Sequence, residues 1–138
     1  MLFKAYIETK GFSDIIDITD YAQNFLKETN FSGGLCNIFC PGSTCAITLM
    51  EYEDGLIKDA KNFFDKIIPQ SKDYEHCKKW GDCNGFSHLR SLLLKPSLTV
   101  PFENKKLLLG TWQQIVLIDF DNRERKREVY FKFIKDYD

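Results

Sequence analysis

Two histidines are the side chains of this sequence best suited to acid–base chemistry. His76 and His88 are the only imidazoles in the chain, and both lie in or beside a polar, irregular segment at residues 70–85. An imidazole titrates near neutral pH, so it can transfer a proton or bind a metal ion. We therefore predict His76 and His88 as catalytic residues and as ligands of a divalent metal, Mg²⁺ or Zn²⁺. The alternative is a surface histidine and a hydrogen-bonded histidine at a helix start.

The polar segment also carries carboxylate, amide and thiol groups. Asp82, Asn84 and Ser87 lie between the histidines, and with them they could hold a phosphorylated ligand or a metal ion. We predict Asn84 as a substrate-binding residue. Cys77 and Cys83 lie in the same segment, but their spacing does not follow a paired CxxC pattern, so a structural zinc site is not expected.

A turn at residues 41–44 offers a different kind of site. Its sequence, Pro-Gly-Ser-Thr, brings two hydroxyls and free backbone amides together between two apolar runs, and such a turn can hold an anion. We predict Ser43 and Thr44 as substrate-binding residues. The turn lacks the Gly-Lys-Ser/Thr ending of a Walker motif, which excludes a P-loop nucleotide site. A plain hairpin turn would have the same sequence.

A carboxylate at a strand end is a further candidate for catalysis. Glu51 follows the second apolar run, where it could act as a base or bind Mg²⁺. We predict Glu51 as the third catalytic residue.

The stretch at residues 107–127 reads as short strands joined by polar turns. Trp112 and Gln113 interrupt an otherwise apolar strand, and a polar amide there needs a partner at a site or across a subunit interface. Asp121 and Arg123 lie in the following turn, and a guanidinium that pairs with a carboxylate can instead bind phosphate. We predict all four as substrate-binding residues. A surface ion-pair cluster is the alternative for the charged groups.

Composition limits the class of protein. The chain has 138 residues and fits one domain, 1–138. Its formal net charge of −1 gives no field to hold a nucleic acid. No apolar segment is long enough to span a bilayer, and the N-terminus lacks the pattern of a signal peptide. We expect a cytoplasmic protein with no membrane partner, whose five cysteines are reduced and mostly fill the core.

Apolar periodicity predicts an α+β fold. Strands are expected at residues 2–9, 13–18, 35–40, 44–50, 97–102, 106–109, 112–120 and 125–134, and helices at 21–28, 54–68 and 87–94. We expect strands 35–40 and 44–50 to pair as a buried antiparallel hairpin, and stretch 107–127 to form a hairpin. Helix 54–68 should lie on a sheet, and strand 97–102, which carries Pro101, should lie near an edge.

These motifs resemble the YjbQ family, formerly called UPF0047. The resemblance rests on residues 97–101, Ser-Leu-Thr-Val-Pro, followed by Gly-Thr-Trp-Gln-Gln at 110–114. It extends to Gly42 through Thr48, to the Tyr-Glu-His step at 74–76, to Asn84 with His88, and to residues 119–125. It covers nearly the whole chain, from about residue 11 to 134.

The resemblance implies a single domain with a mostly antiparallel, strongly curved β-sheet and two to three helices packed on it. It also implies a homotrimer with sites between subunits and a secondary thiamine-phosphate synthase activity, in which a pyrimidine group is transferred to thiazole phosphate and pyrophosphate is released. A small phosphorylated molecule would then be the ligand. By position, the polar set of the family falls on Glu51, His76, Asn84, His88, Gln113 and Arg123.

Two positions depart from the family pattern. Many relatives carry His-Thr-Thr where this chain has Gly-Ser-Thr at 42–44, which removes one ligand of a three-histidine metal site. Lys105 replaces a glycine of the signature. The alternative to an enzyme is therefore a non-catalytic trimeric module that binds a small phosphorylated ligand or a metal, and a third hypothesis is a structural trimer in which Trp112 and Gln113 serve packing alone.

Overall fold

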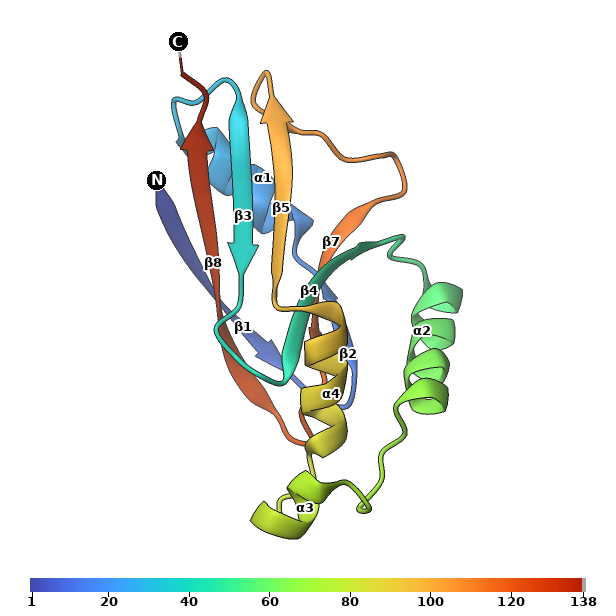
Figure 1. The fold of residues 1–138 in the computed structure, drawn as a ribbon. Helices are drawn as coiled ribbons and strands as arrows, with labels where there is room; N and C mark the ends of the chain where they lie inside the picture. Colours follow the sequence, from blue (N-terminus) through green and yellow to red (C-terminus); the bar gives the residue numbers. More distant parts are fainter. Residues whose placement is uncertain (138) are drawn as a thin grey trace.

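Two antiparallel sheets carry the fold of residues 1–137, the part of the chain that the computed structural model describes (Figure 1). The larger sheet contains, in order across it, β1 (Leu2–Thr9), β8 (Arg125–Lys135), β3 (Gly34–Phe39), β5 (Ser97–Glu103) and β6 (Lys106–Leu107). The smaller sheet contains β2 (Asp14–Asp17), β7 (Gln114–Asp119) and β4 (Cys45–Met50). Residues 1–137 also form four helices, so the α+β prediction is confirmed.

The larger sheet curves around helix α1 (Thr19–Glu28), as Figure 1 shows. Alternate residues of its strands face inward, as the period of two predicts, and in β8 the inward side chains Phe131 and Phe133 are almost completely buried. From α1, Ala22 and Leu26 are fully buried against them. Burying one such large apolar side chain contributes roughly 1.5–3 kcal/mol, so this cluster is the main core.

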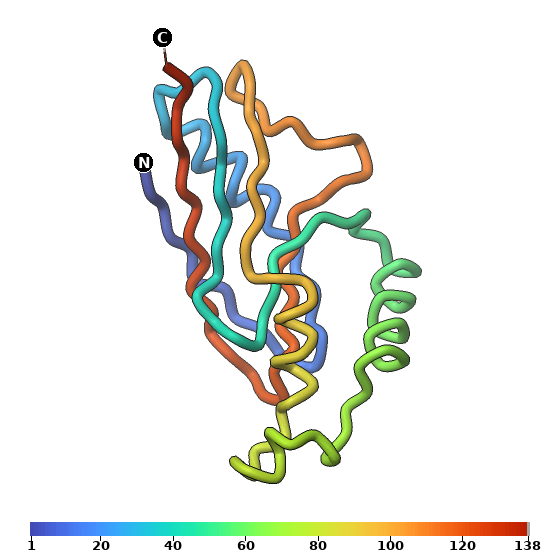
Figure 2. Tube along the Cα trace, in the orientation of Figure 1, coloured from blue at the N-terminus to red at the C-terminus, as the bar shows by residue number. Residues whose placement is uncertain are grey.

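The other three helices lie between β4 and β5 in the chain and border the smaller sheet. They are α2 (Asp54–Ile67), α3 (Glu75–Trp80) and α4 (Gly85–Leu94). α4 packs on β4, where the Ser91 hydroxyl donates to the Cys45 carbonyl at 2.6 Å. α3 lies at the end of the molecule opposite to both termini (Figure 2).

Helix α2 confirms one prediction. Its amphipathic pattern predicts a helix lying on a sheet, and Phe64 is buried in the apolar cluster of the smaller sheet, with its ring edge-on to Phe120 at 5.0 Å. Ile57 and Ala60 of α2 pack against the same cluster. A buried arginine of α4 also holds the end of the helix. Arg90 donates to the Ile68 carbonyl at 2.7 Å and to the Asp65 carboxylate at 3.0 Å.

The predicted hairpins are wrong. β3 and β4 are consecutive in sequence but belong to different sheets, and so do β6 and β7, and β7 and β8. The reason is visible at the turn after β3, where the Cys40 amide donates to the Pro96 carbonyl and the Ile47 amide to the Lys95 carbonyl. These bonds to the start of β5 replace pairing between β3 and β4.

One further prediction missed a helix, and another agrees with the structure. The irregular segment 70–85 contains the short helix α3, which the sequence analysis did not predict. β5 is next to the end of its sheet, bordered on its outer side by the two-residue strand β6, as expected for a strand that carries Pro101. None of the helices within residues 1–137 reaches the length and apolarity that a bilayer crossing requires.

Candidate functional site

A polar pocket of about 550 Å³ lies where the turn before β4, the start of α4 and the turn between β7 and β8 meet. Of the predicted residues, those that line it are Ser43, Thr44, Asn84, His88, Asp121 and Arg123. Residues absent from the prediction also line it, namely Gly42, Asp82, Asn122, Arg125 and Arg127. The fold therefore brings together segments that are about eighty residues apart in sequence.

A buried ion pair forms the floor of this pocket. Arg127 donates from Nε and Nη2 to the two carboxylate oxygens of Asp119, each at 2.8 Å, and Nη2 also donates to the Thr44 hydroxyl at 2.7 Å. Both charged side chains are almost completely buried. Burial alone would lower the pKa of Arg127, but Asp119 outweighs it and the pKa is raised. The Arg127 side chain is therefore charged, and its hydrogen bonds to Asp119 and Thr44 fix its geometry.

Asp121 connects the turn before β4, the start of α4 and the start of β8 around the pocket. Its carboxylate accepts hydrogen bonds from Thr44 at 3.1 Å, Asn84 at 3.2 Å and Arg125 at 2.7 Å. Burial alone would raise the pKa of Asp121, but these hydrogen bonds, that of the Asn122 amide and the Arg125 charge outweigh it and lower the pKa. Asp121 is therefore ionised at neutral pH.

The ionised carboxylate also fixes the orientation of Asn84. A carboxylate only accepts hydrogen bonds, so the Asn84 amide must turn its nitrogen toward Asp121. The Asn84 Oδ1 atom is then buried, with no hydrogen-bond partner among residues 1–137. A buried acceptor without a protein partner costs free energy, so this atom can accept a hydrogen bond from a ligand in the pocket.

The two histidines lie against each other beside the pocket. Their ring centroids are 4.6 Å apart, and His76 Nδ1 lies 3.7 Å from an Asp82 carboxylate oxygen, beyond hydrogen-bond distance. Burial lowers the pKa of His88 and the neighbouring His76 lowers it further, with Asp121 and Asp82 opposing them. His88 is therefore neutral at neutral pH and can accept a proton or a hydrogen bond.

Three arginines follow one another on alternate residues of the chain. All three line the pocket: Arg125 and Arg127 share one face of β8 because side chains alternate along a strand, and Arg123 lies in the bend before it. Arg127 is occupied by Asp119 and Arg125 by Asp121. Arg123 is exposed at the pocket, and its guanidinium forms no hydrogen bond or ion pair with any residue from 1 to 137. Of these three arginines, Arg123 is therefore the one whose guanidinium is free to bind an anion.

Four predicted residues do not line this pocket within one chain; one of them, His76, lies against His88 at its side. Glu51, Trp112 and Gln113 lie near the far end of the β4–β7 pair, where Met50 is opposite Gln114. That end is five residues along β4 from the pocket end, or roughly 17 Å at the usual strand rise. Trp112 is 71% exposed, and the Gln113 side chain accepts a hydrogen bond from the Gly110 amide. Because the expected sites lie between subunits, the roles of these residues stay predictions.

The sequence contained a signal for the residues that the prediction left out. Arg125 and Arg127 continue the alternation that begins at Arg123, and Asp119 lies two residues before Asp121. A period of two among charged residues in a strand indicates that they face one side together. Read as a surface ion-pair cluster, the pattern did not indicate that Arg127 and Asp119 are buried.

A protein-built metal site does not fit these donors. Within residues 1–137 no three side chains from His, Cys, Asp and Glu are grouped to hold a metal ion. A Cβ added at Gly42 would lie 2.8 Å from Arg127 Nη1, and Arg127 is locked by Asp119. A histidine at this position, as the resemblance to the family leads us to expect, would therefore displace Arg127.

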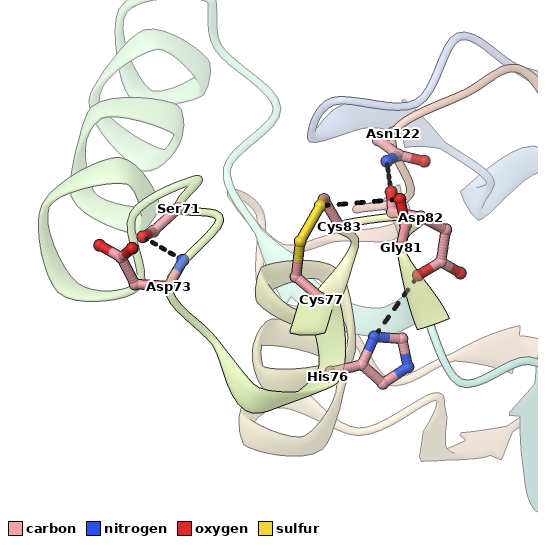
Figure 3. The surroundings of a disulfide bond; sticks show 8 residues. All are labelled: Ser71, Asp73, His76, Cys77, Gly81, Asp82, Cys83 and Asn122. Carbon is pink, nitrogen blue, oxygen red and sulfur yellow. Dashed lines mark hydrogen bonds and ion pairs between the residues drawn. A yellow bond between two sulfur atoms is a disulfide. The ribbon is translucent and has the colours of Figure 1, made fainter. Parts of the chain in front are cut away.

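The cysteines also differ from expectation. Cys77 and Cys83 form a disulfide, so the prediction that all five cysteines are reduced is wrong for this pair (Figure 3). The reason is local, because Gly81 ends α3 in the left-handed region at φ 76° and turns the chain back so that Cys83 meets Cys77. Cys36, Cys40 and Cys45 are free and buried, as predicted.

Comparison with known proteins places this geometry in a family. Residues 4–136 match the family described as UPF0047 protein YjbQ-like. A UPF0047 protein of Archaeoglobus fulgidus is 37% identical over 84% of this chain and 88% of its own length, and UPF0047 protein YugU of Bacillus subtilis is 34% identical over 97% and 99%.

Solved structures agree with the sequence matches. The crystal structure of a YbjQ-like protein of unknown function from Sulfolobus solfataricus has a TM-score of 0.92 at 27% identity and covers 99% of this chain and 97% of its own. That of an uncharacterised conserved protein of the yjbq/upf0047 family from Clostridium acetobutylicum has a TM-score of 0.87 at 32% identity and covers 96% and 99%.

Proposed function

The chain belongs to the YjbQ (UPF0047) family, and from that premise we propose that its pocket binds a small phosphorylated molecule and catalyses a transfer of the secondary thiamine-phosphate synthase type. In this reaction the bond between a pyrimidine methylene carbon and pyrophosphate breaks. A new bond forms between that carbon and the ring nitrogen of thiazole phosphate. Pyrophosphate leaves with the electron pair of the broken bond.

The observation that carries the proposal is the free guanidinium of Arg123 at the pocket. Charge develops on the leaving pyrophosphate, and a fixed cation beside it lowers the barrier. The lining also holds Arg125 and Arg127, but Asp121 and Asp119 neutralise these two guanidinium groups. The unpaired guanidinium of Arg123 favours an anionic ligand, and it can bind a phosphate with two hydrogen bonds.

The remaining polar groups suit the roles of orientation and proton transfer. His88 is neutral, so we assign it a base or hydrogen-bonding role, and His76 is the candidate proton donor. Ser43 and Thr44 present hydroxyls beside the arginines, although Thr44 is already bonded to Asp121 and Arg127. Ser43 is therefore the hydroxyl better placed to contact the ligand.

A turnover assay tests this proposal. Purified protein is supplied with the pyrimidine diphosphate and thiazole phosphate, and thiamine phosphate and pyrophosphate are quantified. We expect product from the wild type, a loss of roughly 100-fold or more in kcat/KM for R123Q, and little change for K126Q. Lys126 is an exposed neighbour outside the lining of this pocket and serves as a matched control.

A non-catalytic binding module is the second candidate, and one observation favours it. Most polar groups of the pocket are already tied to one another, and among residues 1–137 no hydroxyl or thiol is activated by hydrogen bonding to a histidine. Binding of thiazole phosphate that depends on Arg123, without any product in the turnover assay, would select this candidate over the transferase.

Assembly as a homotrimer belongs to the same proposal. Glu51 and Trp112 are exposed and distant from the pocket of their own chain. In a trimer they would have a role if the neighbouring copy presented them to the pocket. Light scattering coupled to gel filtration would then give about three times 16.1 kDa, and W112A would lower that mass. A monomer mass for the wild type would contradict the trimer.

A divalent metal is proposed at His76 and His88 only together with donor atoms that do not belong to this chain. The two imidazoles are too few for a site that holds a metal by itself, so the phosphorylated ligand or a neighbouring subunit would have to supply the other donors. A metal such as Mg²⁺ would neutralise charge on the phosphate groups. Elemental analysis of protein purified without chelator, with and without thiazole phosphate, tests this.

A further inference from the structure

The disulfide connects the two residues that follow His76 and Asp82. Cys77 is bonded through the backbone to His76, and Cys83 to Asp82, as Figure 3 shows. The crosslink joins two cysteines six positions apart in sequence, whose Cα atoms lie 4.1 Å apart. It thereby fixes the spacing between the imidazole of His76 and the carboxylate of Asp82. The His76 Nδ1 atom lies 3.7 Å from a carboxylate oxygen of Asp82.

Helix α3 has little else to hold it in place. It has six residues, none of them buried, and an isolated helix of that length does not persist in water. Its other anchors are side-chain contacts: Tyr74 donates to the Pro69 carbonyl, Asn122 donates to the Asp82 carbonyl at 2.8 Å, and the ring of His76 lies against His88. A segment with so few buried contacts opens readily once a crosslink is removed.

A small thiol can reach this disulfide. Cys83 lines a second pocket of about 320 Å³, together with Lys72, Phe86 and Asn122. Cys77 and Cys83 are only partly buried, whereas the three free cysteines are fully buried. Burial also raises the pKa of Cys36 to about 12, which keeps that thiol protonated and unreactive. Among the five cysteines, the disulfide pair is therefore the group open to exchange.

We propose that Cys77 and Cys83 form a thiol–disulfide switch that sets the position of His76 and thereby controls ligand binding in the pocket. The oxidised form holds His76 and Asp82 in the arrangement of the structure and is competent to bind. The reduced form releases α3, so His76 leaves His88 and the wall formed by Asp82 opens. This control of binding rests on the proposed function, whereas the movement of His76 does not.

The reaction partner is a small thiol of the glutathione class. Two thiols supply two electrons to the Cys77–Cys83 bond and become their own disulfide. The protein bond breaks, and Cys77 and Cys83 each end as a thiol with one proton. Oxidation by the partner's disulfide reverses every step, so the switch follows the ratio of thiol to disulfide around the protein.

The test compares the oxidised protein with protein reduced by dithiothreitol. One readout is independent of any ligand: the nuclear Overhauser effect between the ring protons of His76 and His88. The second readout is calorimetric titration with inorganic pyrophosphate. We expect the ring contact to be present in the oxidised protein and lost in the reduced protein, and the dissociation constant to rise about tenfold on reduction, within the usual range of coupling between sites.

Variants separate this disulfide from other effects of the reductant. The double variant C77S/C83S should behave as reduced protein and should not respond to dithiothreitol. C36A removes a buried cysteine elsewhere and should keep the full response. Mass spectrometry after alkylation should show that residues 77 and 83 alone become labelled on reduction.

Each outcome decides between the proposals. A ring contact that persists after reduction overturns the switch, whatever the titration shows. Equal or tighter pyrophosphate binding in the reduced protein overturns control of the pocket. Loss of the ring contact on reduction with no pyrophosphate binding in either form supports the switch of His76 and contradicts the proposed function.

Discussion

At the scale of single residues, the pocket depends on a charge pair that is closed to solvent. Asp119 accepts two hydrogen bonds from Arg127, one from the Thr9 hydroxyl and one from the Asp121 amide. Both oxygens of the Asp119 carboxylate therefore accept hydrogen bonds, and removing the Arg127 cation would leave a buried negative charge. Arg123 stands in contrast, since its exposed cation is available to a ligand rather than needed by the fold.

This contrast predicts opposite effects for two neighbouring arginines. R127M should lower the free energy of unfolding by about 3–5 kcal/mol, because Asp119 then lacks its counter-ion in a buried place. R123Q, on an exposed side chain, should change it by less than about 0.5 kcal/mol. Urea denaturation followed by circular dichroism measures both. Equal effects of the two changes would show that Arg127 is not the anchor of the pocket floor.

The lowered pKa of His88 predicts a pH dependence with a definite sign. The unfolded chain binds a proton at His88 near pH 6.5, whereas the folded protein binds it only at lower pH. Below pH 6.5 the unfolded state therefore takes up protons that the folded state does not, and stability falls as the pH falls toward the folded pKa. Above pH 6.5 this contribution is fully present.

Two measurements check the His88 prediction. Nuclear magnetic resonance should show the His88 ring titrating below pH 6.5. The difference in unfolding free energy between wild type and H88Q should be constant above pH 6.5 and shift against the wild type on acidification. A His88 ring that titrates above pH 6.5 would contradict the assignment of a neutral imidazole.

At the scale of elements, Arg90 adds polar contacts to the apolar interface between α2 and the smaller sheet. Its guanidinium is buried, lies over the ring of Phe86 at 5.0 Å, and donates to Ser13, Asp65 and the Ile68 carbonyl. The side chain thus joins α4, the end of α2 and the turn before β2. Together with the apolar packing of Phe64, Ile57 and Ala60, this explains how α2 stays attached.

The attachment of α2 can be tested with two variants. R90M should cost about 3 kcal/mol, because it leaves buried acceptors without their charged donor. D65N removes only the exposed partner of Arg90 and should cost about 1 kcal/mol or less. Hydrogen exchange should show faster opening of α2 in R90M. Similar effects of the two variants would mean that the Asp65 pair, and not the buried bonds, holds the helix.

Local sequence patterns predicted the elements better than their pairing. Alternation in residues 2–9 predicts β1 with its observed bounds, and the spacing of apolar residues predicts α1, α2 and α4 within a few positions. The pairing of β3 with β5 and β8 depends on contacts between residues that are far apart in sequence. No local pattern encodes them, and turn chemistry at residues 41–44 suggested a hairpin that does not form.

At the scale of the whole molecule, the arrangement of the strands decides which of the predicted site residues lie close together. The pocket gathers residues from position 42 to position 127, because the turn between β7 and β8, which belong to different sheets, lies beside the start of α4 (Figure 1). Sequence reasoning identified His88, Asn84, Asp121 and Arg123 by chemical type, and the fold places them in one pocket. Glu51 and Gln113 are chemically similar candidates, yet the length of β4 separates them from it.

The central claim is that this pocket binds a phosphorylated molecule through Arg123, and calorimetric titration of thiazole phosphate into oxidised wild type, R123Q and K126Q tests it most directly. Loss of a charged hydrogen bond costs about 1.5–3 kcal/mol, which corresponds to a dissociation constant roughly 10- to 100-fold higher. We predict that rise for R123Q and wild-type affinity for K126Q. Equal affinity in all three proteins, or no binding to the wild type, would contradict the account.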